Sequence, residues 1–124
     1  MTAASQQLGE EGERIAASWL AQRGWRILER RFRSGHRDVD LVAERRGIVA
    51  FVEVKTRRGK DFGHPVEAVN WRKQRELTRS ATVWMARNGG GERMFRFDVI
   101  GVLISNGSAR VCHVENAFLS RSAG

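Results

Sequence analysis

Apolar residues recur every three or four positions in two stretches of the chain and predict two helices. The first stretch covers residues 5–23, and Gly24 follows at a position typical of a helix end. The second begins after Pro65, continues to about residue 88 and stops at three consecutive glycines. In the first helix the apolar positions are Leu8, Gly12, Ile15, Ala16, Trp19 and Leu20. Each helix therefore has one apolar face that can cover a sheet.

Five shorter apolar-rich runs predict the strands of that sheet. They cover residues 25–33, 38–44, 48–56, 94–104 and 109–115. Short turn signals at residues 45–47 and at Asn106-Gly107 predict two hairpins. The order helix, three strands, helix, two strands predicts an α/β fold, in which a mixed central sheet is flanked by two helices. We expect a single domain spanning residues 1–124, with a short tail after about residue 116.

The charge of the chain favours nucleic acid as a partner. Among 124 residues, 22 are Lys or Arg and 14 are Asp or Glu, which gives a net charge of +8 at pH 7. A surplus of this kind attracts phosphate backbones. An anionic membrane would attract it as well, but no predicted helix joins a basic face to a face of Trp, Phe and Leu, so we expect no membrane association. A single cysteine, with no secretory or long apolar segment, favours the cytoplasm.

Two pairs of charged residues interrupt the apolar strands. Glu53 and Lys55 are two residues apart, so their side chains are expected on one face of a strand. Asp38 and Asp40 have the same spacing in the preceding strand of the hairpin, so Asp40 can lie close to Glu53. Two carboxylates in one site repel each other unless a cation lies between them, and their oxygens suit Mg²⁺ or Mn²⁺. The pattern therefore predicts a hydrolase for phosphodiesters, with a metal at Asp40 and Glu53 and with Lys55 orienting water or stabilising negative charge.

Glu13 and Lys73 break the pattern of the two helices. Glu13 borders the first apolar stripe and could join the metal site, but a glutamate early in a helix also complements the helix dipole. Lys73 lies on the second stripe and could touch a phosphate, although such a lysine commonly keeps its charge in water. A structural alternative also stays open, in which Lys55 forms salt bridges with Glu53 and Asp40 and no metal binds.

Basic residues gather after the third strand and on the second helix. Arg72, Arg75 and Arg79 recur on one helical face, a spacing that can follow a duplex backbone or form only a solvated face. Trp71 adjoins that face and could stack on a base. The predicted nucleic-acid contacts are Arg57, Arg58, Lys60, Arg72, Lys73, Arg75 and Arg79.

Four segments that together cover most of the chain resemble a known family. "GEEGERIAASWLAQRGWRILERRFR", "RDVDLVAERRGIVAFVEVKTR", "FGHPVEAVNWRKQRELTRSA" and "FRFDVIGV" resemble the YraN-type proteins, a bacterial family with a restriction-endonuclease-like core. The PD-(D/E)xK nuclease pattern is the strongest part: Asp40 matches its aspartate, and Glu53 and Lys55 match its E-x-K. Glu13 matches a helix glutamate that the similar archaeal Holliday-junction resolvases add to the metal site. The chain departs from the family at residues 37–40, where Gly-Glu-Ile-Asp is usual.

The resemblance implies a restriction-endonuclease-like domain that hydrolyses DNA phosphodiesters with Mg²⁺ or Mn²⁺. Branched or otherwise structured DNA is the favoured substrate. Asp40 and Glu53 would hold the metal, and Lys55 would orient water. Glu13 and Asp38 would assist as further ligands. Related resolvase-like enzymes act as dimers, so a homodimer is one expected state.

Two further expectations lie outside this chemistry. Asp98 matches a recurrent feature of the family, and we expect it to cap or pair with Arg96 without a catalytic role. The alternative function is a non-catalytic nucleic-acid-binding or scaffolding module on the same fold, or a structural partner of a larger assembly. Binding of a divalent metal distinguishes the nuclease from these alternatives.

Overall fold

Two helices and five strands make up the described part of the chain, in the predicted order. The computed structural model describes residues 2–59, 69–89 and 93–119. The elements are α1 (Ala3–Gln22), β1 (Arg26–Ser34), β2 (Arg37–Arg45), β3 (Ile48–Arg58), α2 (Trp71–Arg87), β4 (Met94–Ser105) and β5 (Ser108–Phe118). The α/β class and the order α-β-β-β-α-β-β are therefore confirmed.

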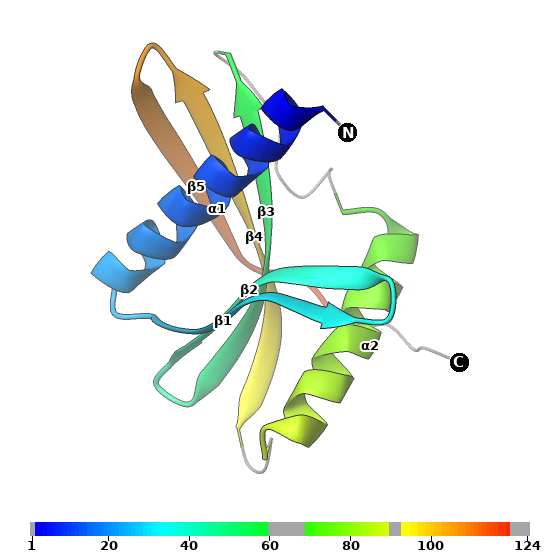
Figure 1. Ribbon diagram of the computed structural model, residues 1–124. Helices are drawn as coiled ribbons and strands as arrows, with labels where there is room; N and C mark the ends of the chain where they lie inside the picture. The colour runs from blue at the N-terminus through cyan, green and yellow to red at the C-terminus, as the bar shows by residue number, and fades with distance from the viewer. Residues whose placement is uncertain (1, 60–68, 90–92, 120–124) are drawn as a thin grey trace.

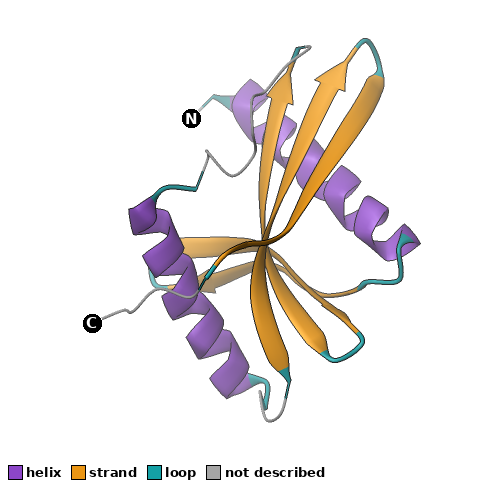
Figure 2. Cartoon of the chain, turned by 180° about the vertical axis from the view of Figure 1, so that it is seen from behind, coloured by secondary structure: helices purple, strands orange, loops and turns teal. Residues whose placement is uncertain are grey.

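The strands form one mixed sheet in the order β1-β2-β3-β4-β5. Among the described strands, β3 and β4 are parallel, and the other neighbours are antiparallel. Parallel neighbours need a crossover, and α2 lies in the connection between β3 and β4. The two helices cover opposite faces of the sheet (Figures 1 and 2), so each face has its own core.

The core under α1 is tight because Gly12 faces the sheet. Ala16, Ala17 and Leu20 of the same helix are at most 1 % exposed and pack against apolar residues of β2, β3 and β4. A Cβ atom added to Gly12 would lie 1.7 Å from the Oγ1 of Thr56 on β3, so a larger residue could not approach as closely. This contact holds the first half of α1 beside the end of β3.

The core under α2 is rich in aromatic residues. Leu77, Ala81 and Trp84 of α2 belong to one buried cluster with residues of all five strands. The indole of Trp84 meets Phe51 edge to face, with ring centroids 5.7 Å apart, and its Nε1–H donates to the Oε1 of Glu29 at 2.9 Å. The polar group of this buried ring is thus satisfied.

Two element boundaries differ from the sequence prediction. Val69 lies before the second helix, and Asn70 is its N-cap, whose side chain accepts a hydrogen bond from the N–H of Lys73 at 2.9 Å. Asparagine is favoured there because it satisfies a backbone N–H that has no partner in the first turn. The predicted start at residue 65 itself lies outside the described residues. β5 continues to Phe118 because the Phe118 ring stacks on Phe97, with centroids 4.8 Å apart.

A cluster of charged residues is buried between β4 and β5. The Asp98 side chain is 0 % exposed and accepts two hydrogen bonds from Arg96, at 3.0 and 3.1 Å. It also lies 2.7 Å from the Nε2 of His113 and accepts the N–H of Asn116 at 3.0 Å. Burial alone would raise the pKa of Asp98, but the hydrogen bonds from His113, Asn116 and Arg96 hold it below its ordinary value. The predicted pairing of Asp98 with Arg96 is confirmed.

Candidate functional site

β2 and β3 separate at the position of the predicted metal site. Their last backbone pair on this side is Leu41 with Val52; beyond it, β1 and β2 turn toward α2, while β3 continues along α1 (Figure 1). The N–H of Val54 donates to the Oδ2 of Asp40 at 2.7 Å. The carboxylate of Asp40 thus accepts the hydrogen bond that a backbone carbonyl of β2 would accept in a continuous ladder. Asp40 therefore lies in the split between the two strands, where elements from both faces of the sheet can reach it.

The half-buried carboxyl of Asp40 meets the buried carboxyl of Glu53 in this split. Because Leu41 pairs with Val52, the next position along the ladder brings Asp40 beside Glu53, which is only 7 % exposed. Burial, the charge of Glu53 and a hydrogen bond with Glu53 raise the pKa of Asp40 to about 8. The pair therefore holds a proton at neutral pH.

Lys73 of α2 is the ion-pair partner of Glu53. Its Nζ lies 2.9 Å from the Oε1 of Glu53. The other oxygen, Oε2, is buried and receives no hydrogen bond from the described part of the chain. Lys55 is exposed and forms no ion pair with a described residue, so Lys73 takes the place that the structural alternative gives to Lys55. Glu53 thus has one satisfied and one unsatisfied oxygen.

Glu13 of α1 approaches the site from the other face. The Nε of Arg31 lies 3.1 Å from its Oε1. Burial and the negative charge of Asp40 raise the pKa of Glu13, although Arg31 opposes the shift. Glu13, Arg31, Asp38 and Asp40 together line a cavity of about 400 Å³ beside the first turns of α1. This cavity gives solvent and ligands access to the carboxyl of Asp40.

Arg31 is a residue of the site that the sequence did not reveal. Its φ angle is +53°, in the left-handed region that residues other than glycine and asparagine rarely adopt. Besides Glu13, its guanidinium lies 3.7 Å from Glu10. Nothing in the sequence distinguished this arginine from its neighbours Arg30 and Arg33. Its role depends on the β1 backbone conformation and on the closeness of α1, which are both tertiary features.

Of the predicted metal ligands, the structure places only some side by side. Asp40 and Glu53 are neighbours in space. Glu13 is close enough to Asp40 that, besides burial, the negative charge of Asp40 raises the pKa of Glu13. Asp38 is exposed, and its Oδ1 lies 3.9 Å from Arg33. In residues 2–59, 69–89 and 93–119, no three acidic, histidine or cysteine side chains are arranged to hold a metal ion together. The structure thus offers a pair of carboxyls and two more acidic groups at the adjoining cavity.

The predicted nucleic-acid contacts on β3 lie past the carboxyls. Arg57 and Arg58 are exposed at the end of the strand, and their backbones continue the parallel pairing with β4. Lys60 lies outside the described residues. Arg57 and Arg58 are therefore the last residues of β3, the strand that also carries Glu53.

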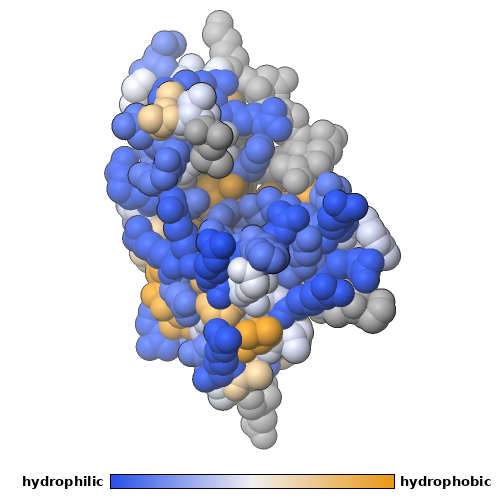
Figure 3. Space-filling model, turned by 45° about the vertical axis from the view of Figure 1, so that its right-hand side comes forward, coloured by the Kyte–Doolittle hydropathy of each residue, from blue (hydrophilic) through white to orange (hydrophobic). Residues whose placement is uncertain are grey.

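Three of the four contacts predicted on α2 share one depression, and Lys73 does not line it. Arg72, Arg75 and Arg79 line a cavity of about 280 Å³ together with Glu76. Trp71, at the start of the helix, is 59 % exposed. Figure 3 shows that hydrophilic side chains cover most of this side of the molecule. No described helix is both long and apolar enough to cross a membrane.

Comparison with known proteins identifies the family. Residues 12–102 match the model of the "Uncharacterised protein family UPF0102", a segment that includes the carboxyl pair and both helices' contacts with it. A UPF0102 protein of Trichlorobacter lovleyi is 47 % identical over 92 % of this chain and 91 % of its own length. Relatives of the same name from Alkaliphilus metalliredigens and Symbiobacterium thermophilum are 44 % and 46 % identical, each over 92 % of this chain and 99 % and 98 % of their own lengths. The chain therefore belongs to the UPF0102 family.

Proposed function

We propose that this protein is a metal-dependent nuclease that hydrolyses DNA phosphodiesters, with branched or otherwise structured DNA as the favoured substrate. The observation that carries the proposal is the carboxyl pair of half-buried Asp40 and buried Glu53, with an unsatisfied oxygen on Glu53. Burying two like charges together costs stability, and such costs are concentrated at functional sites. The match of Asp40, Glu53 and Lys55 to the PD-(D/E)xK pattern supports the same assignment.

The carboxyl pair fits a small divalent cation. Mg²⁺ commonly takes one or two protein carboxylates and completes its shell with water and phosphate oxygens, and Mn²⁺ also prefers oxygen ligands. The Oε2 of Glu53 has no other partner among the described residues and suits this role. Asp40 and Glu53 would hold the ion, which when bound would activate water and the phosphodiester as a Lewis acid.

Two lysines can serve the substrate. Lys73 bonds Glu53 and still has 37 % of its side chain exposed, so its ammonium group can also attract an approaching phosphate. Lys55 is exposed two residues after Glu53 on β3, where it can orient water or stabilise negative charge. Glu13 and Asp38 border the cavity beside Asp40 and would assist as outer ligands.

Cleavage assays test the proposal. With Mg²⁺ or Mn²⁺ the protein should cut at least one of a duplex, a flap and a four-way junction. Glu53→Gln and Lys55→Ala should each lower the rate by roughly 100-fold or more, because each removes a group that acts on the transition state. DNA affinity should change little, and Glu115→Gln, an exposed carboxylate on β5, is the matched control. A pure preparation that cuts none of these substrates with any divalent metal would contradict the proposal.

A non-catalytic nucleic-acid-binding or scaffolding module is the second candidate. It is favoured by one observation: basic side chains already neutralise part of the site, since Lys73 pairs with Glu53 and Arg31 with Glu13. In that case log affinity for DNA should fall linearly with log salt concentration, as for any set of phosphate contacts. Glu53→Gln would then leave every measured function unchanged.

A further inference from the structure

Lys73 places a positive charge of the protein itself at the carboxyl pair. Its Nζ lies 2.9 Å from the Oε1 of Glu53, a residue that would hold the metal ion. Burial and the charge of Glu53 raise the pKa of Asp40, and the positive charge of Lys73 opposes this shift, so the ammonium group acts on both carboxyls. Lys73 therefore competes for the oxygens that a divalent cation would use.

The ammonium group satisfies Glu53 only in part. The Oε2 of Glu53 is buried and receives no hydrogen bond from a described residue. An ammonium group is a compact point charge, whereas a planar guanidinium can bond both oxygens of a carboxylate. Asp98 shows the second arrangement, because the Nε and Nη2 of Arg96 bond one oxygen each, at 3.0 and 3.1 Å. A buried oxygen without a donor costs stability, so Glu53 can still gain from a further cation.

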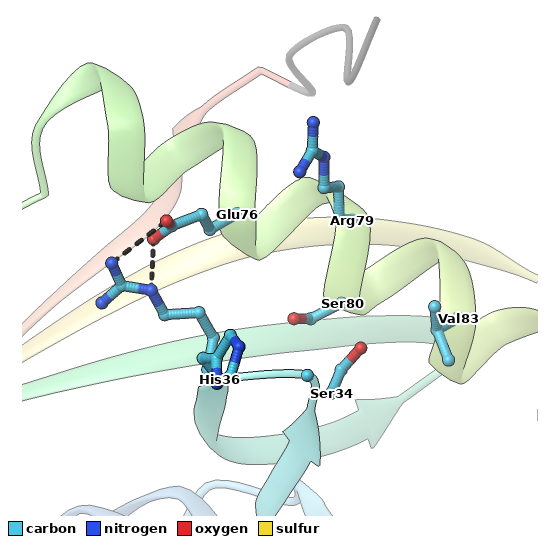
Figure 4. A pocket seen from close by; sticks show the side chains of 8 residues that line it. Ser34, His36, Glu76, Arg79, Ser80 and Val83 are labelled. Atoms are coloured by element: carbon cyan, nitrogen blue, oxygen red, sulfur yellow. Dashed lines mark hydrogen bonds and ion pairs between the residues drawn. The ribbon is translucent and has the colours of Figure 1, made fainter.

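The backbone of α2 is held independently of the ion pair between Lys73 and Glu53. At the start of the helix, the side chain of Asn70 accepts the N–H of Lys73 at 2.9 Å. One turn later, Glu76 is bound by Arg37 at the start of β2, whose Nη2 donates to the Oε1 of Glu76 at 3.0 Å (Figure 4). The ammonium group can therefore leave Glu53 by rotation of its flexible four-carbon stem while α2 stays in place.

The side chain of Lys73 also reaches the predicted nucleic-acid surface. It is 37 % exposed, although its ammonium group contacts a buried carboxylate. The two preceding residues belong to that surface: Trp71 is 59 % exposed, and Arg72 lines the depression on α2. Lys73 thus lies between the carboxyl pair and the face on which a phosphate would approach.

Charge balance disfavours Lys73 and a metal ion together at the carboxyls. Even with Asp40 and Glu53 both ionised, a divalent cation and an ammonium group carry more positive charge than the pair carries negative charge. Like charges repel strongly where water is partly excluded. A phosphate of the nucleic acid supplies the missing negative charge, and it can bond the ammonium group once the metal has taken Glu53.

We propose that Lys73 couples metal binding to nucleic-acid binding: its ammonium group neutralises Glu53 in the metal-free protein and moves to a phosphate of the nucleic acid when the metal binds. Lys73 is then a positioning residue, which first holds Glu53 and afterwards holds the phosphate. By linkage, nucleic acid and metal raise each other's affinity by the same factor. The inference rests on the proposed function, because it takes a metal at the carboxyl pair and nucleic acid as the partner.

Calorimetric titration of the full chain with Mn²⁺ alone tests the competition. Lys73→Gln should bind Mn²⁺ roughly tenfold more tightly than the parent, because no ammonium group competes for Glu53. Lys73→Arg should bind it about fivefold more weakly, because a guanidinium can bond both oxygens of Glu53. Lys55→Gln removes the same charge from an exposed position on β3 and should bind Mn²⁺ much like the parent.

Binding of a fluorescent duplex with and without Mn²⁺ measures the coupling itself. Every protein in this series carries Lys55→Ala, so that cleavage is slow. Mn²⁺ should raise the DNA affinity roughly tenfold when Lys73 is present and much less in Lys73→Gln. If Lys73 served only to stabilise the fold, its replacement would lower the melting temperature and leave this factor unchanged.

The outcomes separate this inference from the proposed function. Equal Mn²⁺ affinity of the parent and both Lys73 variants would overturn the inference and leave the nuclease proposal standing. A parent that binds no Mn²⁺ would overturn both. Coupling that depends on Lys73, without cleavage of any substrate, would support the inference and count against the nuclease alone. If Lys73→Gln is too unstable to titrate, Lys73→Arg decides, because Mn²⁺ affinity equal to that of the parent would contradict the competition.

Discussion

Half-buried Asp40 and buried Asp98 are both carboxyls on central strands, yet their environments shift the two pKa values in opposite directions. Asp98 accepts hydrogen bonds from Arg96 and Asn116 and contacts His113, and its pKa lies below the ordinary value. Asp40 lies beside a second carboxyl, and its pKa rises to about 8. Loss of solvent contact by itself raises the pKa of both, so the partners decide which carboxyl is a structural element and which belongs to a candidate site.

The two clusters also differ in whether their charged groups all have partners. The Asp98 cluster contains its own counter-charges and needs no ligand. The Asp40–Glu53 pair receives one lysine, and one oxygen of Glu53 stays unsatisfied in the described structure. We infer that the Asp98 cluster stabilises the fold. We propose that the Asp40–Glu53 pair lowers the stability of the protein and serves to bind a cation.

The largest expected effect is at Asp98. Asp98→Asn should destabilise the protein by about 3 kcal/mol, because it removes the buried carboxylate that pairs with Arg96 and leaves that arginine, among the described residues, only its longer ion-pair contact with Glu115. The folded-state pKa of Asp98 is depressed, so its contribution is present above the unfolded pKa of about 3.9 and is lost as pH falls through the lower folded value. Urea titrations at several pH values measure this. Asp38→Asn, at an exposed carboxylate, is the control, and an equal effect of the two substitutions would abolish the contrast between the clusters.

The second effect is the response to metal. Mn²⁺ at about 100 times its dissociation constant should stabilise the parent by about 2.7 kcal/mol, since it binds the folded state. Asp40→Asn should lose most of this gain, and Asp98→Asn should keep it. Thermal melts with and without Mn²⁺ provide the measurement. Equal stabilisation of the parent and Asp40→Asn would place the ion elsewhere and refute the assigned site.

The third effect is the pH dependence of stability that comes from Asp40. The folded pKa of Asp40 is about 8, so as pH rises the carboxyl loses its proton at a lower pH in the unfolded chain than in the folded protein. The free energy of unfolding therefore falls as pH rises from about 4 to about 8. Asp40→Asn mimics the protonated form and can still accept the N–H of Val54, so it should be about 1–2 kcal/mol more stable than the parent at pH 7. The two proteins should converge near pH 4. A mutant less stable than the parent at pH 7 would contradict the raised pKa.

The smallest effect sharpens the role of Lys73. Lys73→Gln should cost about 1 kcal/mol, because its ion pair with the buried Glu53 is partly exposed to solvent. In Glu53→Gln the same substitution should cost much less, which gives a coupling energy of about 1 kcal/mol in a double-mutant cycle. Lys55→Gln is the control and should show no coupling with Glu53 in stability. Coupling to Lys55 instead would reverse the assignment of partners.

The sequence by itself determined the secondary structure and the Asp40–Glu53 contact. Apolar spacing of three or four residues marked α1 and α2, and the short turn at residues 45–47 defined the hairpin that aligns Asp40 with Glu53. These features are local, because periodicity and turn length act over a few residues. The start of α2 was less clear, since Val69 continues the apolar spacing while Asn70 caps the helix.

The tertiary structure alone decided which charges neutralise the carboxyls. The sequence offered Lys55 as the ion-pair partner of Glu53, but the packing of α2 brings Lys73 to 2.9 Å instead. Likewise, the split between β2 and β3 and the close approach of α1 at Gly12 place Arg31 against Glu13. An ion pair depends on distances between elements that are far apart in the chain. Local spacing does not encode those distances, whereas the packing of the two helices on opposite faces of the sheet fixes them.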